Sequence, residues 1–152
     1  LILVDGERVP ERPAARGVLG WLRTDSTREE VARAAFEGVL FGLYEGLLAL
    51  ERQGVRTDGR LLVTGGGARS AAYRQLLADV FGRPVFFPDV GDAAAVGIAA
   101  QAAAILRGRR VADLTAEWAP PAPVVAEPRR DQHMDEARDR YRALVAQEAL
   151  DA

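Results

Sequence analysis

Several residue types are missing from this chain, and each absence excludes a class of chemistry. The 152 residues include no cysteine, which excludes disulfides, cysteine nucleophiles and cysteine metal sites. All 20 basic residues are arginine, so chemistry based on a lysine side chain is excluded as well. The single histidine, His133, lies in a charged segment and has no second ligand type beside it. We therefore expect no metal site.

Charge and hydrophobicity are ordinary for a globular domain with one core. The formal net charge is −2 and 49% of the residues are hydrophobic. A chain without excess positive charge does not favour a nucleic-acid partner. The longest apolar stretch, 93–106, is shorter than the ~20 residues that a membrane span needs. With no secretory signal visible, we expect a cytoplasmic protein with no membrane partner.

The organisation of the chain indicates a piece of a longer protein. The sequence opens at Leu1 with a strand-like apolar run, 1–4, and no methionine precedes it. We expect one domain within 1–152, made of a loop region at 1–27, an α/β core at 28–110, and a C-terminal extension with a helix at 111–152.

Three consecutive glycines, Gly65, Gly66 and Gly67, are the most informative feature. An apolar run at 61–64 precedes them and a helical pattern starts at Ser70, which predicts a strand, a turn and a helix N-terminus. Because glycine has no Cβ, a flat ligand can lie against the main chain, and the helix start offers free N–H groups there. The pattern predicts a nucleotide-binding turn, with a tight turn that binds nothing as the alternative.

Capping signals predict the helices around this turn. Thr27 and Glu30 form a capping box, Gly54 ends the same helix, and Asp92 caps a later one. We expect helices at 28–53, 70–80, 93–106 and 131–149, parallel strands at 61–64 and 84–87, and irregular structure at 107–128.

The first of these helices carries two further patterns. Gly38, Gly42 and Gly46 share one face, which indicates close packing, and a ligand on that face is the lesser alternative. Glu37 lies in an apolar context. A catalytic role is conceivable there, but a partly exposed or arginine-paired carboxylate is the ordinary interpretation.

Five segments together resemble the C-terminal domain of the FGGY carbohydrate kinases, in particular the xylulose kinases of actinobacteria. In chain order they are Gly6–Pro10, Ala15–Gly17, Glu30–Gly38, Gly65–Ser70 and Ala95–Ala99. The resemblance covers nearly the whole chain. It implies an α/β fold, namely part of the C-terminal, actin-like (ribonuclease-H-like) ATPase lobe of a sugar kinase.

The resemblance also implies an activity, the transfer of a phosphoryl group from Mg-ATP to D-xylulose to give D-xylulose 5-phosphate. ATP and Mg²⁺ would be the cofactors, and a small sugar would bind to the missing N-terminal part. The catalytic aspartate would lie upstream of Leu1, so no catalytic residue is expected here and the fragment alone would be inactive. Alternatives are a kinase for gluconate, glycerol or ribulose, or a nucleotide-binding module without catalysis.

By the same resemblance, Gly66 and Ser70 hold positions that contact the adenine and ribose. Gly65 and Gly67 would shape the turn, and Arg69 would touch the rim of the nucleotide. The Ser70 hydroxyl could bond the base or could simply cap the helix.

The chain departs from the family pattern at two positions. Val9 stands where threonine is usual, and Trp21 stands where the signature has glycine. The second departure puts the geometry of residues 17–22 in question. Apolar surface built to meet missing parts would be exposed, and a homodimer could hide it.

Overall fold

The computed structural model describes residues 7–8, 11–12, 17–129 and 132–148. The strand expected at 1–4 lies outside these residues. The described part of the expected loop region contains a small antiparallel pair, β1 (Glu7–Arg8) and β2 (Glu11–Arg12). No helix in the described part is long and apolar enough to cross a membrane.

Helix α1 (Arg28–Arg52) begins where its capping signal places it. The Thr27 hydroxyl oxygen accepts from the Glu30 N–H at 3.2 Å, and the Glu30 carboxylate accepts from the Thr27 N–H at 2.9 Å. Gly54 follows the helix with a φ of +80°, a conformation that favours glycine. The predicted boundaries of this helix are confirmed because both ends are set by residues within one turn.

A three-stranded sheet lies beside the helices, with the strand order β3–β4–β5. The pairing of β3 (Leu61–Leu62) with β4 (Val85–Phe86) is parallel, as expected. β5 (Val124–Ala126) pairs antiparallel with β4. The expectation of irregular structure at 107–128 was therefore wrong, since this region holds both β5 and the helix α4 (Val111–Trp118).

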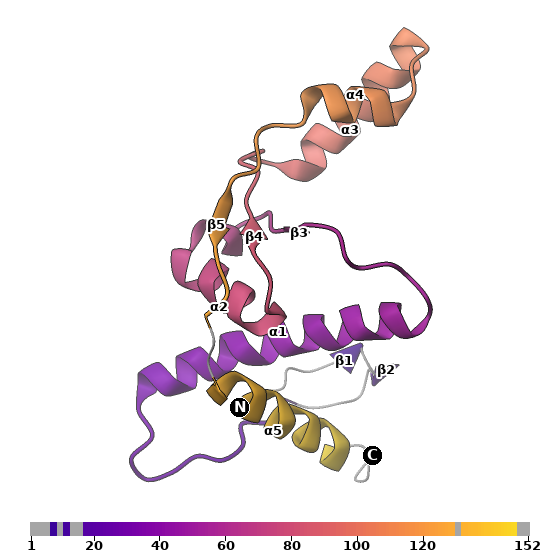
Figure 1. Ribbon diagram of the computed structural model, residues 1–152. Helices are drawn as coiled ribbons and strands as arrows, with labels where there is room; N and C mark the ends of the chain where they lie inside the picture. Colours follow the sequence, from indigo (N-terminus) through magenta and orange to yellow (C-terminus); the bar gives the residue numbers. More distant parts are fainter. Residues whose placement is uncertain (1–6, 9–10, 13–16, 130–131, 149–152) are drawn as a thin grey trace.

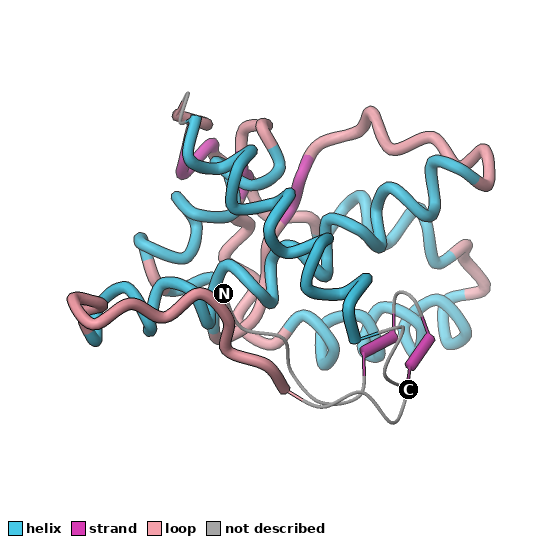
Figure 2. Tube along the Cα trace, turned by 90° about the horizontal axis from the view of Figure 1, so that it is seen from below, coloured by secondary structure: helices cyan, strands magenta, loops and turns pink. Residues whose placement is uncertain are grey.

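The core forms where α1, α2 (Ala71–Phe81) and α5 (Gln132–Glu148) meet the sheet. Figures 1 and 2 show α5 crossing α1 on the side away from α4. Phe41 and Tyr141 are both buried, with ring centroids 5.6 Å apart. Buried side chains of the cluster come from all these elements: Leu40, Phe41, Leu77, Val80, Val85, Met134, Tyr141 and Leu144.

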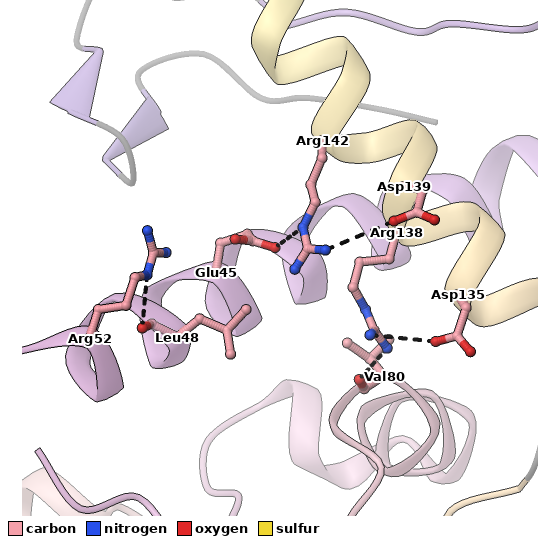
Figure 3. Close-up of polar contacts among 8 residues, drawn as sticks. All are labelled: Glu45, Leu48, Arg52, Val80, Asp135, Arg138, Asp139 and Arg142. Atoms are coloured by element: carbon pink, nitrogen blue, oxygen red, sulfur yellow. Dashed lines mark hydrogen bonds and ion pairs between the residues drawn. The ribbon is translucent and has the colours of Figure 1, made fainter. Parts of the chain in front are cut away.

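Polar contacts at the rim of this core attach α5 to α1 and α2 (Figure 3). The Arg142 guanidinium donates to the Glu45 carboxylate at 2.7 Å. The Arg138 guanidinium lies 4.7 Å from the centroid of the Tyr44 ring and donates to the Val80 carbonyl at 3.4 Å. Polar contacts at the rim and apolar contacts in the core therefore hold α5 in the same position.

Helix α3 (Ala93–Arg107) packs on α4, and the two form a hairpin that projects beyond the ends of β4 and β5 (Figure 1). Asp92 caps α3 as expected, accepting from the Ala94 and Ala95 N–H groups at 3.0 Å. In α3, Ala100 and Ala104 are buried, but Ile98 and Ile105 are 68% and 84% exposed. A helix apolar on all sides is normally buried, so this hairpin leaves a face uncovered.

Candidate functional site

The triple-glycine turn lies between β3 and α2. The helix expected from Ser70 is α2, with Ser70 as its N-cap, and a 3₁₀ turn, η1 (Gly67–Arg69), lies between the glycines and this helix. The N–H groups of Ala68, Arg69 and Ser70 donate to the carbonyls of Gly65, Gly66 and Gly67 at 3.1–3.2 Å. The N–H groups of Gly66 and Gly67 bond to no other group in the described part of the chain. The turn is exposed at all three glycines.

The three glycines differ in why the fold accepts them. Gly65 has a φ of +91°, which strains any side chain. Gly66 has ordinary right-handed angles, φ −61° and ψ −43°, and a Cβ there would meet nothing within 4 Å. A Cβ on Gly67 would approach the Tyr73 ring at 3.4 Å. The backbone of this chain therefore demands glycine at position 65 but not at position 66.

The Ser70 side chain caps α2, since its hydroxyl oxygen accepts from the Tyr73 N–H at 3.3 Å. Capping was one of the two roles expected for this residue. The hydroxyl can still donate its proton to a second group, so capping does not use up the side chain. Arg69 is exposed at the end of η1.

Ser70 also lines a cleft of about 570 Å³ between α1 and α2. Phe36 and Tyr73 form its aromatic wall, packing edge to face with centroids 6.1 Å apart. Burial raises the pKa of the Tyr73 hydroxyl above its ordinary value. Arg33 and Arg129 also line the cleft. An aromatic wall with polar groups at its edges can hold a flat, partly polar ligand.

Ser70 is the one residue of the predicted set that lines this cleft; Gly65, Gly66, Gly67 and Arg69 do not. The aromatic lining residues, Phe36 and Tyr73, were not predicted as site residues. No local signal could have found them, because they belong to different helices and meet only in the tertiary structure.

Trp21 occupies a strained position. Its φ is +58°, the one positive value at a residue other than glycine in the described part. This conformation explains why glycine would suit the position. The half-exposed ring lines a second cleft, of about 440 Å³, between the loop before α1 and α5.

Glu37 is paired with an arginine, which is the ordinary alternative stated for it. The Arg33 Nε donates to its carboxylate at 2.6 Å. On the glycine face of α1, Gly38 is buried and Gly42 and Gly46 are half-buried. Among the described residues, no three His, Cys, Asp or Glu side chains group around a metal position.

Comparisons with known proteins agree on one family. The model of the FGGY family of carbohydrate kinases, C-terminal domain, matches residues 3–106. A xylulose kinase of Streptomyces coelicolor is 36% identical over 87% of this chain and 28% of its own length. A xylulose kinase of Streptomyces rubiginosus is 34% identical over 98% of this chain and 31% of its own. This chain thus spans less than a third of these relatives.

Relatives with other substrates also match. A glycerol kinase of Dechloromonas aromatica is 37% identical over 88% of this chain and 25% of its own length. A gluconokinase of Bacillus subtilis is 37% identical over 60% of this chain and 18% of its own. Among solved structures, xylulose kinase from Rhodospirillum rubrum has a TM-score of 0.71 and 28% identity, covering 98% of this chain and 30% of that one.

Proposed function

Because this chain belongs to the FGGY family of carbohydrate kinases, we propose that it is the ATP-binding C-terminal part of an enzyme that phosphorylates a sugar. D-xylulose, giving D-xylulose 5-phosphate, is the substrate that the two Streptomyces relatives favour. The rest of the enzyme would supply the sugar pocket and the catalytic aspartate, so the chain alone would not transfer phosphate. A cytoplasmic location goes with this proposal, since ATP is the donor.

One observation carries the proposal, namely the open space above Gly66. The conformation of this residue suits any amino acid, and its missing side chain relieves no contact within the described part. A bound nucleoside gives a reason for glycine that the chain itself does not. The free N–H groups of Gly66 and Gly67 lie in the turn that leads into α2. Free N–H groups at such a position bind anions and polar ligands.

The residues of this chain would position the nucleotide, while ATP would supply the phosphoryl group. Gly65 and Gly67 would shape the turn and Gly66 would lie under the nucleoside. The Ser70 hydroxyl would donate to the base or ribose, and Arg69 would lie at the rim. Phosphoryl transfer depends mainly on positioning and charge neutralisation. Mg²⁺ would be held through the phosphates and the other part of the enzyme, and we assign it no residue here.

Two other substrates have support from relatives, which are a glycerol kinase and a gluconokinase. The nucleotide turn does not discriminate among them, since the sugar would bind elsewhere. Phosphorylation assays of the longer enzyme with D-xylulose, glycerol and gluconate as competing acceptors would decide the substrate.

Calorimetric titration with Mg-ADP tests the nucleotide site in this chain. We expect binding by the wild type and a loss of at least about tenfold in affinity for Gly66→Val, because the side chain would enter the space assigned to the nucleoside. Gly59→Val is the matched control, since Gly59 also has open space and no positive φ. Equal binding by both variants would place the nucleotide elsewhere, and a folded wild type without any binding would contradict the proposal for the isolated chain.

A further inference from the structure

Arg74 connects helix α2 to the glycine turn. It is the fourth residue of α2, and its N–H donates to the Ser70 carbonyl at 3.1 Å. Its side chain reaches back past the start of the helix, where Nη1 donates to the Ala68 carbonyl at 2.7 Å. This is the length of a charge-assisted hydrogen bond, which is stronger than a bond between neutral groups. Ala68, its acceptor, is fully buried in the middle of η1.

The same guanidinium lies over the ring of Phe87, with Cζ 5.5 Å from the ring centroid. Phe87 directly follows β4, and its N–H donates to the Pro123 carbonyl at 3.1 Å. Arg74 therefore bridges two backbone segments, the turn after β3 and the end of β4. Both segments belong to the same edge of the sheet because β3 and β4 run parallel.

The environment of Arg74 is not that of an ordinary ion pair. No carboxylate in the described part pairs with it, and its buried Nε has no hydrogen-bond partner there. A cation in the first turn of a helix is also opposed by the helix dipole. Since neither an ion pair nor the helix dipole stabilises this half-buried cation, we look for its role in the backbone segments that it connects.

The turn itself has little to hold it in place. Its three glycines lose much conformational freedom on ordering, and its hydrogen bonds are at 3.1–3.2 Å in a segment where every residue but Ala68 is exposed. A ligand bound by such a turn would lose affinity to the cost of ordering it, unless another group orders the turn beforehand. The bond from Arg74 to the Ala68 carbonyl fixes the middle peptide of η1.

We propose that Arg74 is a positioning residue that holds the 65–70 turn in its nucleotide-binding conformation. This inference rests on the proposed function, since it assigns the turn to a nucleotide. Arg74 acts through the Ala68 carbonyl and Phe87, and we assign it no contact with the nucleotide.

The test uses the whole chain with Arg74→Met, which keeps the length of the side chain and removes its charge and donors. Arg60→Met is the matched control, because Arg60 lies over the neighbouring Phe86 ring at 5.4 Å and bonds to no residue of the turn. Two quantities are measured: the hydrogen exchange of the Ala68, Arg69 and Ser70 amides without ligand, by NMR, and the Kd for Mg-ADP.

We expect Arg74→Met to accelerate exchange of these amides by at least about tenfold and to weaken ADP binding by a similar factor, since a charged hydrogen bond is lost. Arg74→Lys should recover part of both effects, and Arg60→Met should show neither. Unchanged exchange in a folded Arg74→Met variant would overturn the inference, as would faster exchange with unchanged ADP affinity. A wild type that binds no ADP would instead refute the proposed function, and the exchange rates would still decide whether Arg74 orders the turn.

Discussion

Adding one methyl group at Gly65 and at Gly66 should change the stability of this domain in opposite directions. A Cβ at either position would meet no other atom within 4 Å, so packing contributes nothing to the difference. The two residues differ in their backbone angles. Gly65 has a φ of +91°, whereas Gly66 has a φ of −61° and a ψ of −43°.

The size of the effect follows from these angles. Replacing glycine by alanine restricts the unfolded chain at both positions, which stabilises the fold by about 0.4–1 kcal/mol where the conformation suits alanine. Gly66→Ala should gain this amount. Gly65→Ala gains the same term but pays roughly 1–2 kcal/mol for a left-handed conformation. Because the entropy term is common to both, the variants should differ by about 1–2 kcal/mol.

Urea unfolding followed by circular dichroism measures this difference directly, and thermal midpoints should separate by roughly 2–8 °C. Equal stabilities, or a lower stability for Gly66→Ala, would refute the described geometry of the turn. The outcome also bears on function. A Gly66→Ala variant that gains stability would show that the fold does not need this glycine, which leaves ligand binding as its reason.

Two further predictions concern features outside the turn. Trp21→Gly should be more stable than Trp21→Ala by roughly 0.5–1 kcal/mol, although alanine is usually the more stabilising of the two residues. Both variants lose the indole ring, but only glycine relieves the strain of the positive φ. An alanine variant of equal or greater stability would contradict this. The exposed face of α3 should drive self-association, which the paired change Ile98→Glu and Ile105→Glu should reduce with little effect on stability, because both side chains are largely exposed. Sedimentation analysis measures this, with Leu50→Glu on α1 as the control, and a wild type that is monomeric at high concentration would contradict the expectation.

The local features of the fold were predictable from the sequence because neighbouring residues make them. Thr27 and Glu30 cap α1 through each other, and Asp92 caps α3 through amides two and three residues away. Gly54 follows the end of α1 in the conformation that glycine favours. Interactions this short are complete within one helical turn, so they do not depend on the rest of the molecule.

The parallel pairing of β3 with β4 was expected, but other structure that depends on distant partners was missed. β5 is a strand because it pairs with β4, about 40 residues earlier in the chain. Neither its proline-rich approach nor its three residues indicate a strand alone. The short helix α4 was missed for a similar reason, since it packs on α3 and its Leu114 side chain is fully buried.

The candidate site divides in the same way. Three glycines between an apolar run and a helical pattern identified the turn, because glycine in that place changes what the backbone can do. The sequence could not show that Phe36 meets Tyr73, or that Arg74 reaches back to the Ala68 carbonyl and over Phe87. Backbone conformation is encoded locally, whereas the side chains that wall a cleft or clamp a turn are brought together only when helices and strands pack.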